Sequence, residues 1–239
     1  MIERLLRKLE LRDPLHPPER AALQASLVGP VRFAAGEAMV LQGSSPDRST
    51  LLLEGLTGRV VTMHDGAQQI TSVHIPGDFV DLHSFLLRRM DHSVVALTDC
   101  RVATAAHPKL RDLTSRFPHL ARLLWLNTLL DAAMHRQWLA AMGRRGAVGQ
   151  LAHLICEMNL RLEVVGLAAD GAFDLPLSQA QFADILGRSR ATVNAAVQDL
   201  RARGLVAWRG SRLEIADWDA LAELAEFNPT YLQLEAMPV

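Results

Sequence analysis

The sequence predicts an α+β protein in which a barrel or jelly roll of short antiparallel strands is followed by a long helix and a group of short helices. Between Val31 and His107, segments rich in Val, Leu, Ile and Thr alternate with Gly, Pro and Asp about every ten residues. From 109 to 142 the apolar residues recur at helical spacing. From 177 to 205, two short amphipathic segments adjoin at a glycine. Strand-rich and helix-rich regions are therefore expected in succession.

Composition limits the class of protein. A chain of 239 residues, 49% hydrophobic and 21% charged, fits one or two globular domains with a sizeable core. Apolar runs stay below the length of a membrane-spanning helix, and the charged N-terminus MIERLLRKLELRD does not resemble a signal peptide. The two cysteines, Cys100 and Cys156, are far apart, which argues against a disulfide framework or a cysteine-held metal. We therefore expect a cytoplasmic protein without membrane contact.

The N-terminal segment, residues 1–28, is expected to form short helices. Pro17 and Pro18 suit the first turn of the second helix, which should end near Leu27. The first helix carries an apolar stripe of Leu5, Leu6, Leu9 and Leu11. We expect an N-terminal flap with no chemistry of its own.

The long helix, about 109–142, is apolar on more than one side, with Pro118 in the first turn of its main segment. Such a helix needs two surfaces to cover it. The barrel can cover one, and a second copy of the chain can cover the other as a parallel helix pair; the alternative is a fully buried helix inside a monomer. Polar residues interrupt the apolar pattern, so the residues at the contact between the two helices are not assigned. The predicted dimerisation residues are Leu120, Leu123, Leu124, Leu126, Leu130, Met134 and Trp138.

Glycines and paired arginines at 143–146 predict a joint between two domains. The first domain is then 1–142 and the second 147–239. In the second, we expect a helix over 147–165, a loop over 166–174, and a last helix that Asp217 caps.

The two short segments after 177 have the signals of a helix-turn-helix. Ser178 and Ser189 each precede an apolar-periodic run and suit an N-cap, and Gly187 suits the end of the first helix. Two short helices around a tight glycine turn form this motif, and its second helix, here 189–202, enters the major groove of DNA. The alternative is an ordinary helical hairpin in a core.

Charge favours the DNA-binding alternative. Between Ser178 and Arg212 there are six arginines against two aspartates, a local charge of +4 in a chain of net charge −1. Residues 205–215 predict two strands around an Arg-Gly-Ser turn, the wing of a winged helix. The candidate DNA-contacting residues are Ser178, Gln179, Arg188, Ser189, Arg190, Thr192, Asn194, Arg209 and Arg212.

The order of barrel, long helix, joint and winged helix-turn-helix resembles the Crp/Fnr family of bacterial transcription regulators. Pro76-Gly77-Asp78-Phe79 and the run GRSRATV at 187–193 carry the resemblance, which extends from about Leu11 to Ile215. It implies a β-roll like that of cyclic-nucleotide-binding domains and a homodimer that reads a two-fold symmetric site in double-stranded DNA. It also implies RNA polymerase as a partner.

By the same resemblance, Arg190 matches the arginine that donates to a guanine edge, while Ser189, Thr192 and Gln179 are phosphate candidates. Ala191 and Ala195 stand where many members have a glutamate and a second arginine that read bases. The operator should therefore differ from the familiar half-sites, with Asn194 as a substitute reader.

The effector cassette departs further from the family pattern. In cyclic-nucleotide-binding members, a Gly-Glu pair holds the ribose and an Arg-Ser pair neutralises the phosphate. Because the matching pairs here lack the glutamate and the arginine, cyclic AMP is not expected. Two cysteines are also too few for an Fnr-type cluster, which needs four. The candidate pocket residues are Asp81, Leu82, His83, Ser84, His92, Ser93, His135 and Arg136.

The barrel's histidines leave an alternative open, namely haem or metal sensing through a pair such as His83 and His92. HxH and HxxH spacings are absent, so we predict no metal and no cofactor, and favour a ligand-free cassette or an unrecognised small molecule. A cupin-like metal-dependent or ligand-binding barrel with a non-DNA role is the alternative function, and it lacks the close histidine pair such sites use. A module whose DNA face has decayed would not need Arg190 or a basic wing. The sequence thus predicts a regulator and not an enzyme.

Overall fold

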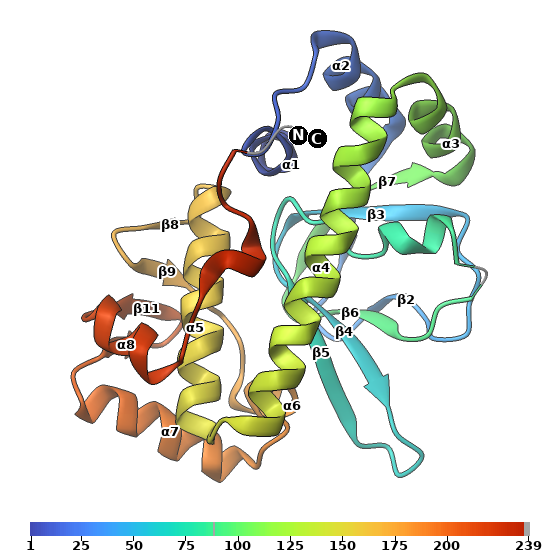
Figure 1. Cartoon of the computed structure of the whole chain (residues 1–239). Coiled ribbons are helices and arrows are strands. Elements are labelled where there is room, and N and C mark those ends of the chain that lie inside the picture. Colours follow the sequence, from blue (N-terminus) through green and yellow to red (C-terminus); the bar gives the residue numbers. More distant parts are fainter. Residues whose placement is uncertain (88, 237–239) are drawn as a thin grey trace. The chain divides into compact units, whose positions relative to one another are not determined.

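The computed structural model describes residues 1–87 and 89–236, which form two compact units (Figure 1). The first unit comprises Met1–Ala132 and the tail from Gln233, and the second comprises Ala133–Leu232. The division falls inside the long helix α4 (Pro118–Arg144).

The first unit contains the β-roll. Neighbouring strands are antiparallel and form two sheets, one in the order β1-β7-β3 and the other in the order β2-β6-β4-β5. The predicted fold class is confirmed, and the 3-10 helix η1 (Leu82–Phe85) lies between β5 and β6. The strands are β1 (Leu27–Phe33), β2 (Ala38–Val40), β3 (Arg48–Glu54), β4 (Thr57–Thr62), β5 (Gln68–His74), β6 (Ser93–Ala96) and β7 (Cys100–Ala106).

Helices α1 (Glu3–Glu10), α2 (Pro17–Ser26) and α3 (His107–Arg116) pack with the start of α4 and with the roll. The stripe predicted on α1 is buried at Leu5, Leu6 and Leu9, while Leu11 is half-buried. One apolar cluster joins the first-unit elements through Leu5, Leu9, Leu23, Leu51, Leu110 and Leu120. The N-terminal helices are therefore part of the first unit's core.

The second unit is built on α5 (Ala147–Val164), most of whose residues are buried. The prediction of a loop over 166–174 is wrong. Two short strands form there, β8 (Ala168–Ala169) and β9 (Ala172–Asp174). They form because Phe173 is fully buried and pairs with Leu213 of the neighbouring strand. The sheet order is β10-β11-β9-β8. The remaining elements are α6 (Gln179–Leu186), α7 (Arg190–Ala202), β10 (Val206–Arg209), β11 (Arg212–Ile215), α8 (Trp218–Leu224), which Asp217 caps, and η2 (Pro229–Leu232).

A buried carboxylate, Glu157 of α5, connects three parts of the second unit. Its oxygens accept hydrogen bonds from Trp138 Nε1 at 3.1 and 3.2 Å, from Arg161 Nη1 at 3.0 Å and from the Tyr231 hydroxyl at 2.8 Å. Glu157 has no exposed surface. A carboxylate without water needs such partners, so the end of α4 and the chain after α8 are both tied to α5.

The exposure of α4 corrects the predicted dimer surface. Leu120, Leu123 and Leu124 are buried in the core of the first unit, and Trp138 is buried with its indole on Glu157. Side chains buried in the protomer are not free to meet a partner. The large apolar side chains that α4 exposes are Trp125 at 67%, Leu129 at 50%, Leu139 at 73% and Met142 at 36%. Leu126, Leu130 and Met134 are half-buried.

Within the part of the chain that the structure describes, α4 and the other helices are too short or too polar to cross a membrane.

Glu157→Ala should destabilise the second unit by about 3–5 kcal/mol, because it leaves the buried Arg161 guanidinium without its carboxylate. Urea unfolding followed by tryptophan fluorescence measures the change. Glu163→Ala, on an exposed side chain of the same helix, is the matched control and should cost far less. Equal losses in the two variants would show that the buried network contributes nothing special.

Candidate nucleic-acid interface and effector pocket

The turn between α6 and α7 is held by side-chain caps. Ser178 Oγ accepts from Gln181 N at 3.2 Å, and Gln181 Oε1 accepts from Ser178 N at 2.7 Å, which is a capping box. Gly187 ends α6 at φ 61° and ψ 40°, a left-handed conformation that costs a residue with Cβ roughly 1 kcal/mol or more. The predicted cap, helix and glycine turn are all present.

The second helix, α7, starts at the solvent. Ser189 Oγ accepts from Thr192 N at 3.1 Å and lies 2.8 Å from Thr192 Oγ1. Val193, Ala196 and Leu200 form the buried face. The first turn therefore presents its exposed side chains and the positive end of the helix dipole to an anion such as DNA phosphate. The exposed residues are Ser189, Arg190, Ala191, Thr192 and Asn194.

Two arginines at this turn differ in their surroundings. Arg190 is exposed, and its positive charge acts on the carboxylate of Asp184 in α6. Arg188 donates from Nε to Gln150 Oε1 at 3.2 Å and from Nη2 to the carbonyl of Arg145 at 3.3 Å. Sequence reasoning grouped both as DNA contacts. The structure gives Arg188 a bracing role within the second unit.

The predicted wing is the hairpin of β10 and β11, which turns at Gly210 with φ 57°. Arg209 and Arg212 face each other across the ladder and are both exposed. Arg212 Nη1 lies 3.5 Å from Asp174 Oδ2. Trp208 packs edge-on against Phe182 of α6 with ring centroids 5.3 Å apart. That contact fixes the wing relative to α6.

In the first unit, the effector candidate Asp81 is fully buried. It accepts hydrogen bonds from the backbone N–H and the hydroxyl of Thr50. Burial, which these bonds offset only in part, raises the pKa of Asp81 to about 7. An open hollow beside it has a volume of about 480 Å³. Its apolar wall includes Phe33, Met39 and Val102, so the hollow suits a small ligand with an apolar part.

Arg59 of β4 is a central residue of this region that sequence reasoning missed. Its guanidinium is buried, donates to the carbonyl of Val80 at 3.0 and 3.3 Å, and forms an ion pair with Asp131 of α4. Its Nη2 lies 3.5 Å from His83 Nδ1. An isolated arginine on a strand carries no motif, so only its burial distinguishes it.

The structure brings His83 and His92 together, with ring centroids 5.1 Å apart, although the sequence offered no close spacing. His92 Nδ1 lies 2.9 Å from Asp91 Oδ1. The Nε2 atoms of both rings are buried and have no hydrogen-bond partner in the described part of the chain. Burial, together with the charge of Arg59, lowers the pKa of His83 to about 4 and lowers the pKa of His92 as well. Both rings are therefore neutral at pH 7.

The remaining pocket candidates are not all at one place. Ser84 Oγ lies 3.3 Å from His107 Nε2, and Ser93 Oγ accepts from Gln42 N at 3.0 Å. Leu82 packs against the first-unit core. His135 and Arg136 belong to the second compact unit, so their part in the pocket stays a prediction.

A β-roll unit and a unit with a winged helix-turn-helix define a class of DNA-binding regulator. Residues 30–117 match the Cyclic nucleotide-binding domain family, and residues 149–224 match the Crp-like helix-turn-helix domain family. The chain is 30% identical over 183 residues to the Nitrogen fixation regulation protein FixK of Bradyrhizobium diazoefficiens, spanning 74% of this chain and 73% of FixK. It is 29% identical over 199 residues to the Transcriptional activator protein FnrL of Cereibacter sphaeroides, spanning 81% and 79% of the two chains.

The chain belongs to the Crp/Fnr family of transcription regulators. The solved structure of FixK2 from Bradyrhizobium japonicum has the same fold, with a TM-score of 0.74 at 23% identity over 82% of this chain and 98% of FixK2. The predicted family, fold class and DNA-binding regulatory function are thereby confirmed. These relatives are regulators and not enzymes.

Asp81→Asn should change how the stability of the first unit depends on pH. Because the pKa of Asp81 is about 7 when folded and near 4 when unfolded, stability should fall as pH rises from 4 through 7, by up to about 1.4 kcal/mol per pH unit. Asparagine cannot ionise, so the variant should gain on the wild type between pH 5 and pH 8. Urea unfolding at both pH values measures this. If the free energies of unfolding of the variant and the wild type differ by the same amount at pH 5 and at pH 8, this prediction is contradicted.

Proposed function

We propose that this regulator acts as a homodimer that reads a two-fold symmetric site in double-stranded DNA through the helix at 189–202. The observation that carries the proposal is the position of Arg190, whose side chain is exposed at the start of α7. A recognition helix reads bases with residues of its first turns, and two of them one helical turn apart give a symmetric site.

The side chains around Arg190 suit distinct contacts. Arg190 suits a bidentate pair with guanine, and Asn194, one turn further on, suits a second base or a phosphate. The hydroxyls of Ser189 and Thr192 suit phosphates, which position the helix without reading sequence. Further phosphate candidates are Ser178 and Gln179 at the start of α6 and Arg209 and Arg212 of the wing. Arg188, already hydrogen-bonded inside its unit, would reach DNA only by giving up those bonds.

Arg190→Ala should weaken binding to the selected operator by about 1–3 kcal/mol and relax the preference at one base pair of each half-site. Selection from random duplexes, followed by titration of the enriched site, measures both.

The matched control is Arg203→Ala, which removes the same charge from the other end of α7, where Arg203 pairs with Asp199. It should change affinity for all sequences alike and leave the preference intact. If Arg190→Ala keeps the wild-type affinity and base preference, the assignment of α7 as the reading helix is wrong.

The exposed residues of α4 support the homodimer. Positions 125, 129, 132, 136 and 139 follow the alternating spacing of four and three that a coiled-coil seam needs, and Trp125, Leu129 and Leu139 occupy three of them. Leu86 and Leu87 line a surface hollow together with Trp125, so apolar surface continues beyond the helix. A second copy with the same stripe would cover this surface isologously.

Leu129→Glu should convert the dimer to a monomer at micromolar concentration, because it places like charges opposite each other in an apolar seam. Light scattering after size exclusion measures the mass. Leu41→Glu, an exposed leucine of the β-roll at 61% exposure, is the matched control and should leave the mass unchanged. A dimeric Leu129→Glu protein would move the interface away from this stripe.

For regulation, we infer a population shift in which an effector or partner biases α4 and the break at Arg145–Gly146, between the predicted domains 1–142 and 147–239. The hollow beside Asp81 and the neutral His83–His92 pair suit an unidentified small molecule better than cyclic AMP. With only two cysteines, Cys100 and Cys156, both buried, the chain has fewer thiols than the four that an Fnr-type cluster takes. The remaining parts of the proposal are a cytoplasmic regulator that meets RNA polymerase at its site, without enzyme activity.

A further inference from the structure

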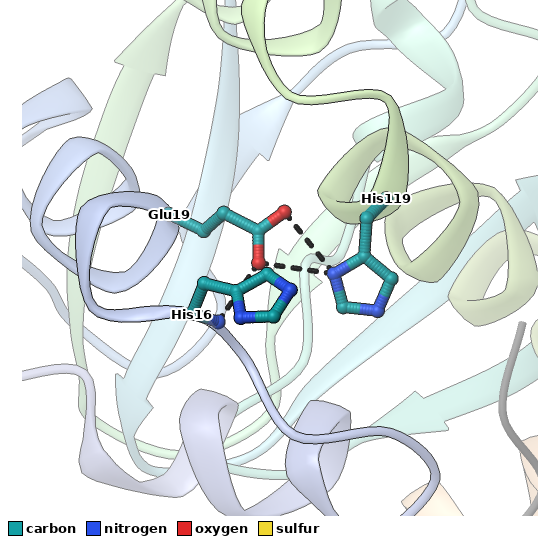
Figure 2. Close-up of side chains that lie close together, drawn as sticks. All are labelled: His16, Glu19 and His119. Atoms are coloured by element: carbon teal, nitrogen blue, oxygen red, sulfur yellow. Dashed lines mark hydrogen bonds and ion pairs between the residues drawn. The ribbon is translucent and has the colours of Figure 1, made fainter.

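Two histidines from distant parts of the sequence meet one buried carboxylate in the first unit. His16 precedes α2, Glu19 lies in the first turn of α2, and His119 lies in the first turn of α4 (Figure 2). His119 Nδ1 lies 3.1 Å from Glu19 Oε1 and 3.0 Å from Oε2. One ligand atom from each of the three residues lies within 4.8 Å of the others.

A fourth group, Asp13, orients this arrangement from outside. Its Oδ2 lies 3.2 Å from His119 Nε2, on the side of the ring away from Glu19. A carboxylate on the far nitrogen of a histidine fixes the ring and leaves the near nitrogen to hold a metal. Glu19 is fixed in turn, because its Oε2 accepts from the backbone N–H of His16 at 2.9 Å.

Part of the cluster has a simpler role. A protonated His119 between Glu19 and Asp13 forms a charge clamp, and the hydrogen bond to Glu19 raises the pKa of His119 accordingly. The clamp does not use the side chain of His16, which is exposed with its ring centroid 5.6 Å from that of His119. A second imidazole is what a metal site adds to a clamp.

We propose that His16, Glu19 and His119 form a binding site for a divalent transition-metal ion of the Zn²⁺ class, with Asp13 as the outer partner of His119. Histidine nitrogen and carboxylate oxygen are the ligands zinc takes at about 2.0–2.2 Å, and three protein ligands leave one position for water. Two such ligands seen at 90–110° from the ion lie about 3.0–3.5 Å apart. The distance from His119 Nδ1 to the Glu19 oxygens falls in that range.

The charge balance also favours a cation here over the other histidine cluster. Glu19 and Asp13 supply two negative charges at the site, and the ion takes the place of the proton of the clamp. His83, Asp91 and His92 have a comparable arrangement of ligand atoms. There burial and the Arg59 guanidinium, which lies 3.5 Å from His83 Nδ1, lower the pKa of both histidines. The same positive charge opposes a metal ion.

A bound ion would join the start of α2 to the start of α4 within the first unit. The predicted N-terminal flap would then acquire chemistry of its own. Metal availability would set how firmly the first turn of α4 is held, independently of any ligand in the β-roll.

The test uses the full-length protein, stripped with a chelator and titrated with Zn²⁺ alone in a calorimeter. We expect saturable binding of about one Zn²⁺ per chain, because the three ligands form a single site. His16→Ala leaves the clamp intact and should weaken binding by more than the roughly 100-fold that loss of an outer partner can cost. Asp13→Asn should weaken binding by roughly 10- to 100-fold.

Two variants serve as controls. His92→Ala tests the other histidine cluster, and His64→Ala removes an exposed histidine outside both clusters; each should keep the site. Circular dichroism should show that His16→Ala is folded. The proposal is overturned if the wild type takes up no zinc, if His16→Ala binds zinc like the wild type, or if His92→Ala abolishes the binding that His16→Ala retains.

Discussion

The helix α4 has more apolar surface than any single core can cover, and this constraint organises the molecule. Its first turns are buried with α1, α2 and α3 through Leu120, Leu123 and Leu124, and Trp138 is buried on Glu157 of the second unit. The apolar side chains left over, Trp125, Leu129 and Leu139, lie in solvent. A helix that leaves such apolar side chains exposed favours contact with a second copy of the chain. The same 27 residues of α4 therefore connect the two units and provide the surface for dimerisation.

The part of the molecule that sequence predicted best is the part whose signals are local. The caps at Ser178 and Ser189 and the glycine at 187 each act within four residues, and all three are where expected. The seam of α4 could not be assigned in the same way, because periodicity reveals two apolar faces but not which of them the protomer covers. Tertiary packing decides that question.

The two histidine clusters also could not be predicted from the sequence, because the fold brings their members together. His83 and His92 are nine positions apart, and His16 and His119 are 103 apart, so no ligand spacing in the sequence connects either pair. The fold connects them through η1 and the loop before β6 in one case, and through the starts of α2 and α4 in the other. Arg59 was equally invisible, since its importance lies in being buried beside Val80, Asp131 and His83.

The two histidine clusters of the first unit differ in the charges that surround them. Around His83 and His92, burial and the charge of Arg59 lower the pKa of both imidazoles, and two buried ring nitrogens have no hydrogen-bond partner in the part of the chain that the structure describes. Around His119, two carboxylates favour positive charge, whether carried by a proton or by a metal ion. Both act on α4: one through Arg59 and its ion pair with Asp131, the other through the first turn. The helix whose exposed stripe is proposed to pair the two protomers therefore contacts both clusters.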